Sequence, residues 1–121
     1  METKKDRAKG ALMGALIGEA LGIGPHWYYD LTELRFEYGS WIDDYTDPKP
    51  GRYHDGLKAG ELSQQGWIIT KMAEYFIQNG RYDQTTFSNM MDKEILPYVD
   101  RVPMGGIGGY TSQMMRHVYQ K

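Results

Sequence analysis

The chain has 121 residues, of which 40% are hydrophobic and 25% charged, and its formal net charge is −2. This length allows one domain or part of one, and the charge balance excludes the basic surface that nucleic-acid binding requires. The absence of cysteine excludes disulfides and thiolate metal sites and fits a reducing compartment. We therefore expect a cytoplasmic chain.

The first predicted element is a helix over residues 5–22, in which alanine and leucine recur at helical spacing. Gly10, Gly14 and Gly18 lie four residues apart and share one face of this helix. Because each interior glycine weakens a helix by roughly 0.5–1 kcal/mol relative to alanine, we expect another backbone to pack closely there. Glu19 interrupts the apolar run, so the segment predicts neither a signal peptide nor a membrane span.

A short helix and a long loop follow. Asp30, with Glu33 three residues later, resembles a capping box and predicts a helix over residues 31–38. Residues 39–61 are rich in glycine, proline and aspartate and predict a loop. A loop of this length inside a compact domain is unusual and often functional.

Two helices are predicted after the loop. Residues 62–79 carry a broad apolar stripe and stop before Gly80, which suits the residue that follows a helix. Asp83 is placed to cap a helix over about residues 84–96, and Pro97 should end it.

The C-terminal part reads as a glycine-rich hinge over residues 103–109, followed by a helix that Thr111 caps. The glycine run could alternatively let the backbone approach a pyrophosphate. No strand pair is predicted anywhere in the sequence, so the expected class is all-α, with one helical domain over residues 1–121.

Several segments carry a resemblance to the ADP-ribosylglycohydrolase family, and they occur in the family's order. The run Gly-Pro-His-Trp-Tyr-Tyr-Asp is the most specific, and it is similar to the crystallin-like branch of that family. The matching segments are residues 7–22, residues 24–30, Tyr53-His54, residues 59–63 and the long helix after them. The resemblance covers residues 7–80 well and residues 81–121 loosely.

The resemblance implies an orthogonal helical bundle. Active members of the family hold two divalent ions, usually Mg²⁺, and cleave the glycosidic bond that joins ADP-ribose to a protein side chain. Their first metal-binding motif, Thr-Asp-Asp-Thr, lies just before the long helix, and a second acidic motif lies far toward the C-terminus. Family domains are roughly twice this length or more, so the chain resembles the N-terminal portion of such a domain.

The equivalent stretch of this chain reads Ser63-Gln64-Gln65-Gly66 and lacks acidic residues. Hydroxyl and amide oxygens are neutral, whereas hard cations prefer carboxylates and water. We therefore expect no metal site and no cofactor. The expected function is that of a pseudoenzyme, a binding or structural module for an ADP-ribose-type small molecule.

Glu19 and His26 are the candidate catalytic residues. Glu19 stands where the family has an aspartate, and it could act as an acid or base or simply bond to nearby loop amides. His26 could serve as a general base or contact a phosphate, or it could be a packed, hydrogen-bonded residue.

The candidate ligand-binding residues are His54, Asp55, Ser63 and Gln64. His54 and Asp55 could orient a water or bind ribose hydroxyls, although Asp55 followed by glycine also reads as a turn. Ser63 stands where the family's threonine hydroxyl would be.

Two alternatives stay open at this point. An active hydrolase would cleave an N- or O-glycosidic bond of ADP-ribose adducts. It would use Glu19, His26 or His54 in place of metal ions to activate water, or it would require a missing C-terminal half or a partner. An incomplete bundle would leave apolar helix faces uncovered, which predicts a homo-oligomer or a partner chain that completes the fold.

Overall fold

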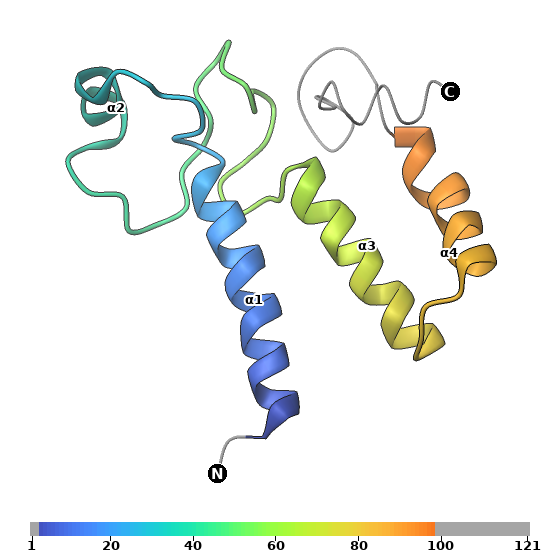
Figure 1. The fold of residues 1–121 in the computed structure, drawn as a ribbon. Coiled ribbons are helices and arrows are strands. Elements are labelled where there is room, and N and C mark those ends of the chain that lie inside the picture. The colour runs from blue at the N-terminus through green and yellow to red at the C-terminus, as the bar shows by residue number, and fades with distance from the viewer. Residues whose placement is uncertain (1–2, 99–121) are drawn as a thin grey trace.

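The computed structural model describes residues 3–98, and all of their regular elements are helices (Figure 1). The all-α prediction is therefore confirmed. The helices are α1 (Lys4–Gly22), α2 (Leu31–Tyr38), α3 (Gln64–Asn79) and α4 (Gln84–Met90), followed by a π-helical turn (Met91–Ile95) and a 3₁₀ turn (Leu96–Tyr98). The predicted hinge over residues 103–109 and the helix capped by Thr111 lie outside the described residues.

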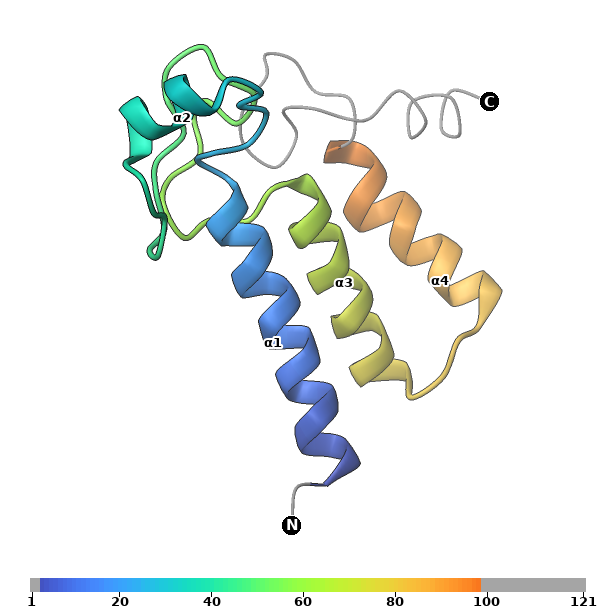
Figure 2. The same cartoon turned by 60° about the vertical axis from the view of Figure 1, so that its left-hand side comes forward.

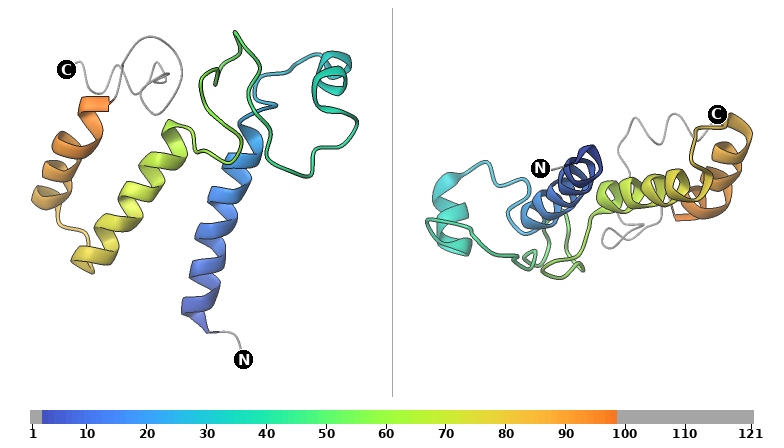
Figure 3. Two further views of the ribbon diagram at one scale, coloured as in Figure 1. Left: turned by 180° about the vertical axis from the view of Figure 1, so that it is seen from behind. Right: turned by 90° about the horizontal axis from the view of Figure 1, so that it is seen from below.

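Three of the helices form a single row. α1, α3 and α4 lie side by side with alternating chain direction (Figure 2), and the view from below in Figure 3 shows them in the same order. α2 and the loop over residues 39–63 lie at the end of the row where α1 ends and α3 begins. Because domains are usually built from at least two packed layers, a single row leaves much of its apolar surface uncovered.

Local sequence signals fix where the helices begin and end. The Asp30 carboxylate accepts the N–H of Thr32 at 2.8 Å, so the predicted cap of α2 is present. The other half of the predicted capping box is replaced, because the Glu33 carboxylate pairs with Arg52 of the long loop. Gly80 ends α3 in the left-handed conformation, with a φ of 69°, as its position predicts.

The predicted helix over residues 84–96 exists, but its second half is not α-helical. Asp83 caps α4 through the N–H of Thr86 at 2.9 Å, and the chain then widens into the π-helical turn. In that turn the N–H of Leu96 bonds to the carbonyl of Met91, five residues back. Pro97 explains the change, because a proline ring clashes with the carbonyl four residues earlier in an α-helix.

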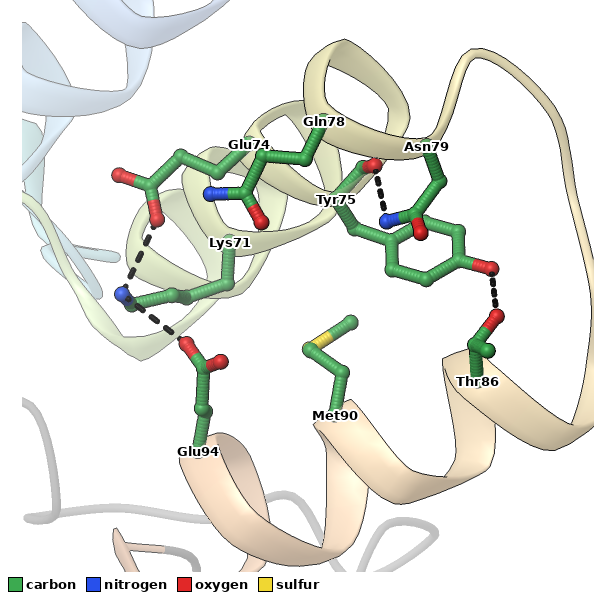
Figure 4. A pocket seen from close by; sticks show the side chains of 8 residues that line it. All are labelled: Lys71, Glu74, Tyr75, Gln78, Asn79, Thr86, Met90 and Glu94. Carbon is green, nitrogen blue, oxygen red and sulfur yellow. Dashed lines mark hydrogen bonds and ion pairs between the residues drawn. The ribbon is translucent and has the colours of Figure 1, made fainter.

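Tyr75 joins α3 to α4. Its hydroxyl lies 2.7 Å from the Thr86 hydroxyl and accepts the N–H of Asp83 at 3.1 Å. Beside it, a hollow of about 130 Å³ opens between the two helices (Figure 4). Lys71 bridges its far end, with its ammonium 3.0 Å from Glu74 and 3.3 Å from Glu94. Hydrogen bonds and ion pairs therefore hold α4 against α3.

The apolar core is small. Two of its members are almost completely buried: Ile23, which follows α1, and Ile95, the last residue of the π-helical turn after α4. The other buried apolar or aromatic side chains are Ala20, Tyr28, Leu57 and Tyr75. No helix within residues 3–98 is both long and apolar enough to cross a membrane.

The expectation of a backbone packed against the glycine face of α1 is wrong for the described residues. A Cβ atom added at Gly10, Gly14 or Gly18 would meet nothing within 4 Å. Next to these glycines, Met13 and Ile17 are 55% and 42% exposed. The row covers only the side of α1 that carries Glu19, so this second apolar side stays open.

Candidate functional site

The end of α1 meets the beginning of α3 through one carboxylate. Glu19 accepts the N–H of Ser63 at 3.1 Å and 3.2 Å through its two oxygens, and it also accepts the Ser63 hydroxyl. The first amides of a helix have no partner within the helix, and the helix dipole places partial positive charge there. A side chain from one helix therefore serves as an anionic cap for another.

Gly66 makes this approach possible. A Cβ atom at this buried position would lie 2.6 Å from a carboxylate oxygen of Glu19, so any side chain here would force Glu19 out of its present position. Ser63, the N-cap of α3, also accepts the N–H of Gln65 at 3.1 Å. Gln64 is the first residue of α3 and is 7% exposed. The stretch Ser63-Gln64-Gln65-Gly66 is thus shaped to receive a carboxylate from α1.

Four aromatic rings gather beside this contact, and we call them the ring cluster: His26, Trp27, Tyr53 and His54. The centroid of His26 lies 4.7 Å from that of His54 and 4.8 Å from that of Tyr53, on which it stacks. Trp27 contacts Tyr53 with a centroid distance of 4.3 Å. The structure therefore brings together two predicted residues, His26 and His54, from opposite ends of a long stretch of chain.

Both histidines of the ring cluster are held neutral. Burial is the main cause that lowers the pKa of His54 to about 4, and the charge that the neighbouring His26 carries when protonated contributes to the same shift. Burial also lowers the pKa of His26, although the Glu19 carboxylate partly opposes that shift. A general base works best with a pKa near the working pH, so His54 is poorly matched to that role near neutrality.

Asp55 is held in a turn at the edge of the site. Its carboxylate accepts the N–H of Gly51 at 2.8 Å, and the residue is exposed. This geometry agrees with the turn that the sequence offered as the alternative to ligand binding.

Gly66 was not predicted as part of the site. A glycine in the first turn of a strong helix nevertheless indicates that another group approaches the helix closely there.

The donor atoms at the start of α3 do not fit a pair of Mg²⁺ ions. Within residues 3–98, no three His, Cys, Asp or Glu side chains are placed to hold a metal ion. Ser63 and Gln64 offer neutral oxygens, and the carboxylate of Glu19 is already bonded to Ser63. Two divalent cations a few ångströms apart repel strongly and need several anionic ligands.

Comparisons with known proteins give a family match and a curated relative. Residues 1–120 match the family described as ADP-ribosylglycohydrolase. The chain is also 30% identical over 92 residues to the ADP-ribosylarginine hydrolase Tri1 of Pseudomonas putida (strain GB-1). That match covers 74% of the chain but 21% of Tri1, so the chain spans about a fifth of that relative's length. The search of solved structures finds no match.

Acid should destabilise the protein through the ring cluster. Because the pKa of His54 is about 4 in the folded chain and 6.5 in a free side chain, the unfolded chain binds a proton that the folded chain excludes. The free energy of unfolding should therefore fall as the pH drops through this interval. We expect this histidine to contribute about 1–2 kcal/mol, since solvent reaches part of its ring. Urea denaturation at a series of pH values measures the effect.

His54→Phe is the matched variant, because it keeps an aromatic ring in the cluster but cannot titrate. All other ionisable groups are common to the two proteins, so the difference between their pH profiles isolates His54. The variant should lose less stability on acidification than the wild type. Parallel profiles would show that the ring is not held neutral.

Proposed function

The chain belongs to the ADP-ribosylglycohydrolase family, and from that membership we propose that it binds an ADP-ribose-type small molecule without performing metal-dependent hydrolysis itself. The observation that carries this proposal is the bonding of Glu19 to the beginning of α3. The place where the family resemblance puts acidic metal ligands here holds a serine, two glutamines and a glycine. The carboxylate that reaches it is bonded to the backbone N–H and the hydroxyl of Ser63.

The ring cluster supports the ligand part of the proposal. Neutral imidazoles can both donate and accept hydrogen bonds, which suits ribose hydroxyls and phosphate oxygens. The aromatic rings of Trp27 and Tyr53 add apolar contact area beside these polar groups. Tri1 is named as a hydrolase of ADP-ribosylarginine, which supports a ligand of the ADP-ribose type for this chain as well.

Hydrolysis without metal ions is the second candidate function. It is favoured by the way the fold places Glu19 close enough to His26 to affect its pKa, with His54 next to His26. Most glycoside hydrolases, however, use two carboxyl groups on either side of the scissile bond. Glu19 supplies one carboxyl group and is bonded to Ser63, so the geometry favours binding over catalysis.

Isothermal titration calorimetry separates the metal question from the ligand question. We expect ADP-ribose to bind with measurable heat in metal-free buffer. Mg²⁺ and Mn²⁺ should show no site tighter than about millimolar, because neutral oxygens cannot replace the carboxylates of a hard-cation site. Micromolar binding of either ion would contradict the absence of metal chemistry, and no heat with ADP-ribose would contradict the proposed ligand.

Incubation with an ADP-ribosylated peptide extends the same test to the second candidate. We expect no release of ADP-ribose. Release that disappears in Glu19→Gln but persists in Glu37→Gln, a half-buried residue on α2 that pairs with Lys49 at 3.4 Å, would instead establish the metal-free hydrolase.

We further propose that a second copy of the chain, or a chain that completes the bundle, covers the open side of α1. Met13 and Ile17 are exposed there, beside glycines that allow close approach of another helix. Monomeric proteins rarely expose large contiguous apolar patches. A helix that is apolar on more than one side is usually surrounded by neighbours.

Sedimentation velocity of the isolated chain should therefore show species larger than a monomer. Ile17→Lys should shift the distribution toward the monomer, because a lysine charge is costly to bury in an apolar contact. Phe36→Lys is the control, since Phe36 is 86% exposed but lies on α2. A wild-type chain that sediments as a clean monomer and does not bind a hydrophobic dye would contradict the proposal.

A further inference from the structure

Two short segments of the chain face each other through their side chains. One segment follows α1, and the other lies in the long loop. The contacting pairs, in chain order, are His26 with His54, Trp27 with Tyr53, and Tyr28 with Arg52. The first two pairs belong to the ring cluster. The third pair continues the same antiparallel register by one residue, but it places a cation above a ring.

Arg52 makes two contacts at once. The central carbon of its guanidinium lies 4.1 Å from the centroid of the buried Tyr28 ring, which is the geometry of a cation–π interaction. The same guanidinium pairs with the carboxylate of Glu33 on α2. A planar guanidinium can do both, because its face meets a ring while its edge meets a carboxylate. Arg52 therefore fixes the loop both to the segment after α1 and to α2.

The backbone between Arg52 and His54 is too short to move independently of this anchor. The Arg52 carbonyl accepts the N–H of Asp55 at 3.0 Å, and the His54 carbonyl accepts the N–H of Leu57 at 3.0 Å. Leu57 is buried in the core. Two consecutive turns thus run from the anchor to a core residue, with His54 between them. The position of the Arg52 side chain therefore constrains the position of the His54 ring.

The His54 ring depends on this placement for its environment. Among the described residues, the titratable groups whose rings contact it are His26 and Tyr53, at centroid distances of 4.7 Å and 4.6 Å. The Glu19 carboxylate of α1 acts in turn on His26. Burial is the main cause of the lowered pKa of His54. If the loop moved away, water would reach the imidazole and this pKa would rise.

We propose that Arg52 is a positioning residue, which holds His54 against His26. It does so through its contacts with Tyr28 and Glu33. The inference rests on the proposed function, since it assigns the residue that prepares the ring cluster for its ligand. A loop that is ordered in advance need not be ordered on binding, which favours affinity. Loss of the anchor should therefore change both the pKa of His54 and the affinity for the ligand.

Titration of the histidine ring signals by NMR tests the placement of His54, whose signal is the one absent from His54→Phe. Glu33→Ala is the decisive variant, because alanine keeps α2 helical but frees the guanidinium of Arg52. The positioning role predicts that the pKa of His54 then rises by about one pH unit toward that of a free side chain. The loss of a negative charge would by itself lower that pKa. Arg52→Gln should raise it as well.

Lys49→Gln is the matched control. Lys49 lies in the same loop, its ammonium is 5.2 Å from the centroid of the Tyr38 ring, and it pairs with Glu37 at 3.4 Å. It thus makes the same two kinds of contact, but with other partners. We expect the pKa of His54 to keep its wild-type value in this variant. An equal rise in Lys49→Gln, no rise in Glu33→Ala, or a wild-type pKa near that of a free side chain would overturn the positioning role.

Calorimetry with ADP-ribose separates this inference from the proposed function. Glu33→Ala should bind ADP-ribose about fivefold more weakly than the wild type, because loop side chains must then be ordered on binding. Removal of a carboxylate would by charge alone strengthen the binding of an anionic ligand. If the wild type does not bind ADP-ribose but the pKa of His54 rises in Glu33→Ala, the positioning role stands and the proposed function fails. Wild-type binding with unchanged affinity and unchanged pKa in Glu33→Ala would overturn the positioning role alone.

Circular dichroism checks that the variants fold. If they do not, the wild type provides a second measurement, because the coupling is reciprocal and protonation of His54 should weaken the packing of Arg52. The side-chain protons of Arg52 should show the ring-current shift of the Tyr28 ring and lose it as His54 titrates. The Lys49 protons near Tyr38 should keep their shift. Simultaneous loss of both shifts, or an Arg52 shift that persists through the titration, would overturn the positioning role.

Discussion

A carboxylate from one helix bonded to the first turn of another is the contact on which this structure depends. Glu19 and Ser63 are 44 residues apart in the sequence, and their hydrogen bonds join α1 to α3 across α2 and the long loop. The row of helices has few other buried contacts, since its core contains only a handful of apolar side chains within the described residues. The position of the ring cluster relative to α3 follows from this junction.

The same contact links the fold to function. The family resemblance places acidic metal ligands at the beginning of the long helix, where they would face cations. In this chain the charges are arranged the other way round. The start of α3 offers the partial positive charge of a backbone N–H, and the negative charge comes from Glu19 of α1. Gly66 is small enough to admit that charge, and Ser63 gives it a second donor. Beside the junction lies the ring cluster, whose two histidines have lowered pKa values, and the binding function that we propose rests on it.

Local signals in the sequence predicted the helices well. Asp30, Asp83 and Gly80 act within one turn of their own helix, so their roles can be read without knowing the fold. The π-helical turn before Pro97 was not predicted, because proline signals an interruption without specifying how the preceding turn adapts. The packing on the glycine face of α1 was predicted wrongly, because the spacing of the glycines shows which face lacks side chains but not whether another element packs against it.

The site was predicted only in part. Glu19, His26 and His54 were identified individually, and the structure brings them into one region. Their grouping depends on how the long loop folds back, which no local pattern encodes. The role of Gly66 likewise depends on a neighbour distant in sequence, the Glu19 carboxylate.

The most direct test of the account is the free energy of unfolding of Glu19→Gln, measured by urea denaturation beside Glu37→Gln. Glutamine keeps the shape of the side chain but removes the negative charge that the N–H and hydroxyl of Ser63 stabilise. We expect Glu19→Gln to lose about 1–2 kcal/mol, in line with charge-assisted hydrogen bonds at a helix start. Glu37→Gln removes a carboxylate whose partner Lys49 is solvent-accessible, so it should change the free energy of unfolding by less than about 0.5 kcal/mol. Equal stability of Glu19→Gln and the wild type would contradict the central role of this contact.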